Sequence, residues 1–135
     1  MSRRIRIQPI LALISALLWM ACQAEEMSSG DISAEAFLAA PPANALVLDV
    51  RSQEEFQEGH VPGAINVPHD ELASRLSELS GGTQRPVVVY CERGGRAGMA
   101  AEVLAEAGYA QILHLEGDMS DWRAKGRPLE SVASD

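Results

Sequence analysis

One segment combines a possible nucleophile with groups that bind anions. It reads Cys91-Glu92-Arg93-Gly94-Gly95-Arg96. The two glycines let the backbone curl with its N–H groups pointing inward, and the arginines add positive charge. A helix is expected to begin where the segment ends, so the positive end of the helix dipole would favour an anion at the same place. The segment therefore predicts a cradle for a small anion around the Cys91 sulfur.

The same surroundings would activate that sulfur. The thiolate is the nucleophilic form of a cysteine, and a helix N-terminus with nearby arginines favours it. A thiolate needs no general base, so the chemistry does not require His60, His69 or His114. These histidines are scattered and no further cysteine accompanies them, so we expect no metal site and no cofactor. The alternative, an inert buried cysteine at a strand end, is disfavoured by the glycines and arginines.

Cys91 directly follows the strongest strand signal in the chain. Residues 86–90 are rich in β-branched side chains and apolar on both faces, as is typical of a strand inside a sheet. Apolar runs at 45–50 and 112–115 predict further strands, and the Ala-rich segment 97–107 predicts a helix. This alternation predicts an α/β fold with a mainly parallel sheet and helices on both faces. Ligands of such sheets bind beyond the carboxyl ends of the strands, where the cysteine segment lies.

Shorter elements are expected between these. Ser52 and Glu55 have the spacing of a capping box and predict a helix that ends near Gly59. The remaining pattern predicts an element leading into a helix at 31–40, an extended piece at 64–67, and helices at 70–79 and 119–125.

The first 24 residues differ in kind from the rest. Three arginines precede an apolar run from Ile10 to Ala21, which is typical of a signal peptide and too short to span a bilayer. A cut after Ala24 would release a soluble exported protein. Alternatively, Trp19-Met20-Ala21-Cys22 resembles a lipobox, which would place the cut before Cys22 and a lipid anchor on its sulfur. The expected organisation is a signal peptide (1–24), a polar linker (25–30), one domain (31–130) and a tail (131–135).

Cleavage would leave a strongly acidic protein. Loss of Arg3, Arg4 and Arg6 changes the formal charge from −8 to −11, which disfavours binding to nucleic acid and to anionic membrane surfaces. Membrane association would then need the lipid anchor on Cys22. Cys91 would have no intramolecular disulfide partner, and an unpaired thiol in an oxidising compartment points to a functional role.

Several ordered motifs between about Ile32 and Pro128 resemble the rhodanese family. They are Leu48-Asp49-Val50-Arg51, Glu55-Phe56, Gly59-His60-Val61-Pro62-Gly63-Ala64-Ile65-Asn66-Val67-Pro68, Val89-Tyr90-Cys91, Gly94 and Arg96-Ala97 in the loop, Glu106-Ala107-Gly108-Tyr109, Leu115-Glu116-Gly117 and Trp122. The exported single-domain form is similar to phage-shock-type periplasmic rhodaneses, so the periplasm is the expected location. The resemblance implies a three-layer, rhodanese-like fold.

The resemblance also implies a function and roles for the site residues. Cys91 would attack a sulfane-sulfur donor such as thiosulfate to give a persulfide, and cyanide or a thiol, including a protein thiol, would take the outer sulfur. The backbone amides from Glu92 to Arg96 would cradle the persulfide. Arg96 or Arg93 would hold the anionic end of the donor. The alternative function is a non-catalytic persulfide carrier or a redox-sensing binding module.

The length of the cysteine loop bears on the chemistry. Relatives that act on phosphate or arsenate have a loop one residue longer, with an arginine six positions beyond the cysteine. Here Ala97 is at the sixth position and Arg96 at the fifth. The shorter loop suits one sulfur atom better than a tetrahedral oxyanion.

Two further residues are candidates for pocket or support roles. Asp49 and Arg51 follow a predicted strand and could touch substrate. However, Arg51 is four positions before Glu55, so a structural ion pair between these two residues is the favoured interpretation.

One position departs from the family pattern. Asp118 follows Gly117, where the family usually has a second glycine. If its carboxylate bordered the pocket, it would repel anionic donors. Glu92, beside the cysteine, would have the same effect.

Overall fold

Strands and helices alternate along the chain in the computed structural model, which describes residues 28–132. The strands are β1 (Ser28–Ile32), β2 (Leu46–Asp49), β3 (Ile65–Asn66), β4 (Val87–Tyr90) and β5 (Gln111–Leu115). The helices are α1 (Ala34–Ala39), α2 (Gln53–Glu58), α3 (Leu72–Arg75), the short 3₁₀ helix η1 (Leu76–Glu78), α4 (Gly95–Glu106) and α5 (Asp118–Ala124). The predicted signal peptide and residues 133–135 of the predicted tail lie outside the described residues.

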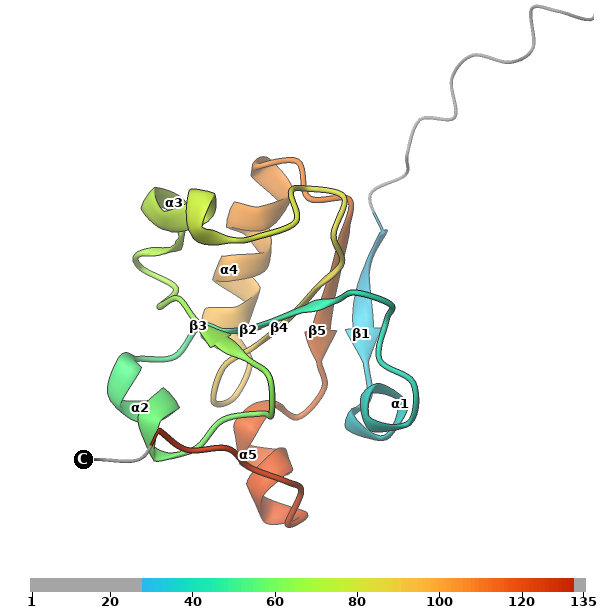
Figure 1. Cartoon of the computed structure of the whole chain (residues 1–135), viewed down its shortest axis with the longest axis vertical. Helices are drawn as coiled ribbons and strands as arrows, with labels where there is room; N and C mark the ends of the chain where they lie inside the picture. Colours follow the sequence, from blue (N-terminus) through green and yellow to red (C-terminus); the bar gives the residue numbers. More distant parts are fainter. Residues whose placement is uncertain (1–27, 133–135) are drawn as a thin grey trace, which may run out of the picture.

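The strands form one sheet in the order β1-β5-β4-β2-β3. Every pairing between neighbouring strands in it is parallel, which confirms the predicted parallel sheet. The carboxyl ends of β1 and β5 point toward α1 and α5 (Figure 1). Because β4 is the central strand, Cys91 leaves the sheet at the middle of its carboxyl edge.

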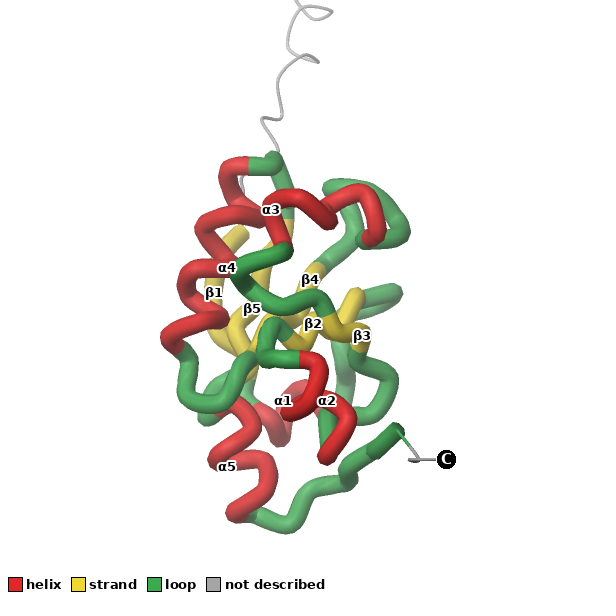
Figure 2. The backbone as a smooth tube through the Cα atoms, turned by 90° about the vertical axis from the view of Figure 1, so that its left-hand side faces the viewer, coloured by secondary structure: helices red, strands yellow, loops and turns green. Residues whose placement is uncertain are grey.

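Helices cover both faces of the sheet, as predicted. Val87 and Val89 of β4 pack in a cluster with buried residues of α3 and α4, whereas Val88 and Tyr90 pack in a second cluster with residues of α1 and α5. In Figure 2 the strands run through the middle of the molecule, with the turns of α4 along one side. Burial on both faces explains the unbroken apolar run of β4.

The first strand differs from its sequence-based prediction. Residues 28–30, which fall in the predicted polar linker, belong to β1 and pair with β5 from Ser28↔Gln111 onward. The strand lies at the edge of the sheet and is mostly exposed, so it carries polar residues and lacks the apolar pattern on which strand prediction depends.

Two predicted helices can be compared in detail. The capping box of α2 is confirmed, because the Ser52 hydroxyl accepts from the Glu55 N–H at 3.2 Å and the Glu55 carboxylate accepts from the Ser52 N–H at 2.9 Å. The single helix predicted at 70–79 is instead α3 followed by η1. Within residues 28–132, no helix has the length and apolar character needed to cross a membrane.

Candidate active site

The loop between β4 and α4 encloses the Cys91 sulfur. Cys91 is only 1% exposed, and its Sγ accepts a hydrogen bond from the Gly94 N–H at 3.0 Å. Gly94 has a φ of 105°, in the region that favours glycine, and a Cβ there would lie 3.3 Å from the Asp118 Oδ2. The loop therefore turns its Gly94 N–H toward the sulfur, and glycine at this position allows the left-handed backbone found there.

The first turn of α5 holds this loop from behind. The N–H of Met119 donates to the Cys91 carbonyl and the N–H of Ser120 donates to the Glu92 carbonyl, both at 3.1 Å. Figure 1 shows the start of α5 next to the loop that precedes α4. These two bonds fix the first two carbonyls of the loop toward α5, and the Gly94 N–H is the loop amide that contacts the sulfur. The loop and α5 are far apart in the sequence, so no local pattern could have indicated this contact.

Asp118, the position that departs from the family pattern, lies behind the loop and not at its mouth. Its side chain is 3% exposed, and its Oδ1 accepts from the Cys91 N–H at 2.8 Å. Its Oδ2 lies 2.9 Å from the Nε2 of His114. The carboxylate is therefore engaged inside the protein, which removes the reason to expect that it repels a donor at the entrance. The contact with His114 was not predicted.

Arg96 lies in the first turn of α4, directly after the loop, and is engaged by a carboxylate. Its two terminal nitrogens lie 2.7 and 3.0 Å from the carboxylate oxygens of Glu55. This hydrogen-bonded pair lowers the pKa of Glu55 to about 2 and raises the pKa of Arg96. Arg93 is exposed and makes no ion pair with any residue in the 28–132 range. Of the two predicted donor-binding arginines, Arg93 is the one without a carboxylate partner among the described residues.

Asp49 and Arg51 form a buried pair beneath the site. Arg51 donates to both carboxylate oxygens of Asp49, with its Nη2 at 2.7 Å, and also to the Gly59 carbonyl at 2.8 Å. Burial disfavours the arginine charge, but the hydrogen bonds to Asp49 and the attraction of nearby negative groups, Asp49 foremost, together outweigh burial and raise the pKa of Arg51. The predicted ion pair between Arg51 and Glu55 is therefore wrong, because Ser52 and Arg96 occupy the Glu55 carboxylate.

Glu92 is also paired. Its carboxylate lies 3.6 Å from the Nη1 of Arg51 and contacts the guanidinium of Arg123. The two arginines offset the negative charge that was expected to repel anionic donors. A hollow of about 410 Å³ beside the cysteine loop is lined in part by Arg51, Glu92 and Arg123.

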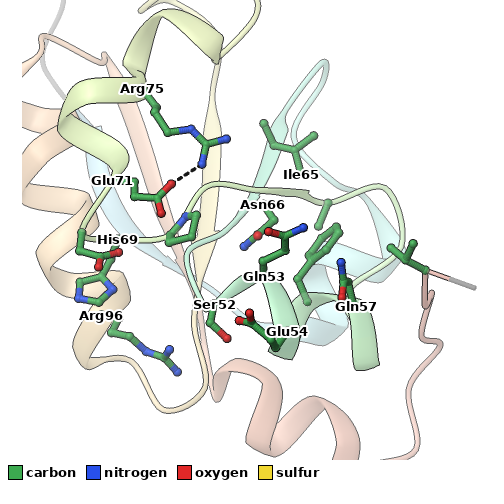
Figure 3. Close-up of a pocket in the computed structure, with 15 residues that line it drawn as sticks. Ser52, Gln53, Glu54, Gln57, Ile65, Asn66, His69, Glu71, Arg75 and Arg96 are labelled. Atoms are coloured by element: carbon green, nitrogen blue, oxygen red, sulfur yellow. Dashed lines mark hydrogen bonds and ion pairs between the residues drawn. The ribbon is translucent and has the colours of Figure 1, made fainter. Parts of the chain in front are cut away.

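A larger groove, of about 820 Å³, lies beside Arg96 (Figure 3) and shares no lining residue with the hollow of about 410 Å³. It runs between α2, β3 and the segment before α3, and the labelled side chains around it are mostly polar. Cys91 is not part of its lining, so the groove meets the cysteine loop only through Arg96.

The histidines do not assemble a metal site. His60 stacks on Phe56 with ring centroids 3.7 Å apart, and its Nδ1 hydrogen-bonds the Phe56 carbonyl at 2.8 Å. These contacts tie the His60 ring to α2. Within the part of the chain that the structure describes, no group of three or more His, Cys, Asp or Glu side chains is placed to hold a metal ion.

Comparisons with known proteins agree with this geometry. The family model described as "Rhodanese-like domain" matches residues 33–125. The chain is 44% identical to an HTH-type transcriptional regulator of Mycobacterium tuberculosis over 64% of its own length, but spans only 38% of that protein. It is 37% identical to the thiosulfate sulfurtransferase PspE of Escherichia coli, with 58% of this chain and 78% of that protein covered. A rhodanese-related crystal structure from Thermoplasma volcanium superposes with a TM-score of 0.66 at 28% identity, over 76% of this chain and 98% of that one.

Proposed function

The chain belongs to the rhodanese-like domain family, and we propose that it is a sulfurtransferase that moves sulfane sulfur through a persulfide on Cys91. The donor would be thiosulfate or a related compound, and the acceptor cyanide or a thiol. Some relatives of the chain carry the name sulfurtransferase. One observation supports the proposal most directly: the Cys91 sulfur accepts the Gly94 N–H inside a loop whose carbonyls are tied to α5.

The reaction needs no redox partner. The Cys91 thiolate would attack the outer sulfur of thiosulfate, forming the new S–S bond as the bond between the two donor sulfurs breaks. Sulfite would leave with that bonding electron pair. Cyanide would then attack the outer sulfur of the persulfide, giving thiocyanate and restoring the thiolate. N–H groups around the loop would stabilise the negative charge on sulfur in both steps.

The surroundings of the sulfur favour a small anionic donor. Because Cys91 is almost fully buried, a donor must present a narrow terminal sulfur to reach it. Arg96 is occupied by Glu55, so we assign the anionic end of the donor to Arg93. An exposed arginine on an acidic protein would also attract the donor electrostatically.

A thiosulfate:cyanide assay tests the proposal. We expect turnover in the full-length protein and none in Cys91→Ser, because serine cannot carry a persulfide. Cys22→Ser is the matched control and should keep the activity of the unchanged protein. Turnover that survives Cys91→Ser would contradict the proposal.

A second candidate is a persulfide carrier or a redox-sensing module. It is favoured by the relative that is a transcriptional regulator, in which a matching segment forms part of a larger protein. This alternative predicts that Cys91 accepts sulfur from a donor and passes it to one protein thiol, without multiple turnover on cyanide. The same assay therefore separates the two functions.

We also propose that the protein is exported to the periplasm. The support is the pattern of residues 1–24, an arginine-rich start followed by a short apolar run. The mass of the protein purified from its native host tests this. A mass that begins at Glu25 indicates ordinary cleavage, and one that begins at an acylated Cys22 indicates a lipoprotein. Retention of Met1 to Ala24 would contradict export.

A further inference from the structure

We propose that Arg123 is a positioning residue that draws the Glu92 carboxylate into the hollow beside the cysteine loop and so keeps the Cys91 sulfur open to anionic substrates. The inference rests on the proposed function, in which a small anionic donor reaches Cys91. No role for Arg123 was expected from the sequence. It acts through Glu92 and need not touch the substrate.

Glu92 carries a negative charge on the residue directly after the nucleophile. Its backbone is fixed, because its carbonyl accepts the N–H of Ser120 at 3.1 Å. Its side chain is 27% exposed and lines the hollow. A carboxylate so close to Cys91 in the chain would repel an anion approaching the sulfur unless it is turned aside and its charge is offset.

Two arginines face the two oxygens of the Glu92 carboxylate. The Nη2 of Arg123 donates a hydrogen bond to Oε1, and the Nη1 of Arg51 lies 3.6 Å from Oε2. Arg51 already donates to Asp49 and to the Gly59 carbonyl, and its distance to Glu92 is too long for a hydrogen bond. Arg123 therefore supplies the hydrogen bond that fixes the Glu92 side chain.

Helix α5 is built to hold Glu92 at two points. Ser120 binds its backbone carbonyl, and Arg123, one turn further along the same helix, binds its side chain. The Arg123 side chain is 44% exposed, whereas the neighbouring Trp122 is buried in the core. Because exposed ion pairs add little to stability, replacing Arg123 should release the carboxylate without unfolding the protein.

Two further arginines attract anions to the sulfur. Arg93 is exposed and has no carboxylate partner within residues 28–132. Arg96 pairs with Glu55, and this hydrogen bond is the main reason why the pKa of Arg96 is raised. The negative charges of Cys91 and Glu92 raise it further, so Arg96 also attracts the sulfur. Both arginines are unaltered in the variants below and act in all of them.

Alkylation of Cys91 by an anionic and a neutral reagent tests the proposal on the full chain at neutral pH. Iodoacetate and iodoacetamide are attacked by the same thiolate with loss of iodide, so the ratio of their rate constants reports charge preference and not the thiolate fraction. The alkylated fraction is read by mass spectrometry on the peptide that contains Cys91, so Cys22 does not interfere.

Arg123→Gln should lower the iodoacetate-to-iodoacetamide ratio about threefold, because the released Glu92 charge repels the anionic reagent. Arg123→Lys keeps a cation and should hold the ratio within about 1.5-fold of the unchanged protein. Equal slowing of both reagents in Arg123→Gln would indicate a purely structural role and would overturn the proposal.

A double-mutant cycle separates the positioning role from direct attraction. In a Glu92→Gln background, Arg123→Gln should change the ratio by less than about 1.5-fold, because no carboxylate is left to release. An equal fall in both backgrounds would mean that Arg123 attracts the reagent itself, which would refute the pair.

A second variant decides if Arg123→Gln fails to fold. Glu92→Asp keeps the charge on a shorter side chain, which draws the carboxylate back from Arg123 and should lower the ratio. Glu92→Gln has no charge and should not lower it. Equal ratios in Glu92→Asp and Glu92→Gln would overturn the proposal.

Matched controls remove a charge away from the loop. Lys125→Gln removes an exposed cation that directly follows α5, and Glu106→Gln removes an exposed acid at the far end of α4. Both should leave the ratio in place. A fall in Lys125→Gln as large as in Arg123→Gln would contradict the proposal, since net charge alone would then set the preference.

The measurement uses no sulfur donor, so its result is independent of whether the protein transfers sulfur. The predicted changes in the ratio without turnover on thiosulfate would refute the proposed function and leave the role of Arg123 standing. A Cys91 that neither reagent alkylates would overturn the proposal, because the role of Arg123 requires a sulfur that small molecules reach.

Discussion

Two arginine–carboxylate pairs flank the cysteine loop and differ mainly in burial. Asp49 and Arg51 have side chains that are 0% and 2% exposed, and Arg51 is further held by the Gly59 carbonyl. Arg96 and Glu55 are 29% and 33% exposed. Both pairs have a shortest N–O distance of 2.7 Å, so geometry alone does not distinguish them.

The difference teaches what each pair contributes. Water and salt screen the exposed pair, so it adds little to stability and acts mainly as a tether between the start of α4, next to the loop, and α2. The buried pair cannot be screened in this way, and each partner compensates a charge that would otherwise be stranded in the core. Breaking the buried pair should therefore cost much more than breaking the exposed one.

The largest effect is expected from Asp49→Ala. The substitution leaves the Arg51 guanidinium buried without its carboxylate, and loss of one partner of a buried pair costs about 3–5 kcal/mol. Urea unfolding at neutral pH measures the loss. Asp70→Ala, which removes an exposed carboxylate, is the control and should change the unfolding free energy by less than about 0.5 kcal/mol. A cost for Asp49→Ala below that of breaking the exposed pair would remove the distinction between the two.

A smaller effect should follow from Gly94→Ala, which tests the loop that lies between the pairs. The new Cβ would meet the Asp118 carboxylate and force a left-handed backbone on alanine, for a cost of about 2 kcal/mol. Sulfur transfer should fall at least about tenfold as the cradle opens. The matched variant is Gly98→Ala in α4, where a Cβ meets nothing within 4 Å, and it should stabilise the protein by about 0.5–1 kcal/mol. Equal effects of Gly94→Ala and Gly98→Ala on stability and on sulfur transfer would contradict the role given to Gly94 in the loop.

Arg93→Ala and Arg96→Ala should differ in how they change the Michaelis constants for anionic and neutral donors. Arg93→Ala should raise the Michaelis constant for an anionic donor about fivefold, and leave that for a neutral donor unchanged, because its free charge holds the anion. Arg96→Ala breaks the tether to Glu55 and should affect both donors equally. Steady-state kinetics with thiosulfate and with a neutral persulfide donor measure both. A charge-selective effect in Arg96→Ala but not in Arg93→Ala would reverse the assignment.

The smallest effect should be the acid dependence of the exposed pair. The pKa of Glu55 in the folded protein is about 2, below its ordinary 4.5, so folding favours the ionised carboxylate. The pair's contribution is complete above about pH 4.5 and disappears as the pH falls through about 2. After allowance for solvent screening, it amounts to no more than about 1 kcal/mol. The unfolding free energy, measured with urea between pH 7 and pH 2, should therefore fall more in the unchanged protein than in Glu55→Gln. Parallel pH dependences of the two unfolding free energies would contradict this prediction.

Local patterns predicted much of the fold and the loop. The capping box of α2 depends on residues three apart, and β4 depends on its own run of valines, so both could be predicted from the sequence. The polar edge strand β1 could not, since only its pairing with β5 makes it a strand. The same limit applies to side-chain partners: spacing favoured Arg51 for Glu55, but the fold brings Arg96 closer to it.

The candidate site likewise combines features that the local sequence predicts with features that depend on how distant elements pack. The glycines of the segment made the contact of the Gly94 N–H with the sulfur foreseeable, because backbone freedom is a property of the segment itself, whereas the wider cradle for an anion stays a prediction. The α5 contacts to the loop and the pairing of Asp118 with His114 depend on where distant elements meet. Position 118 could be recognised only as a departure from a pattern, and its carboxylate proved to face the Cys91 amide and not the entrance.

Mass spectrometry of the Cys91 peptide after exposure to thiosulfate tests the central claim most directly. The account predicts that Cys91 gains the mass of one sulfur atom and loses it again when cyanide is added. A Cys91 thiol that can be alkylated in the folded protein but gains no sulfur from thiosulfate or any other sulfane donor would contradict it.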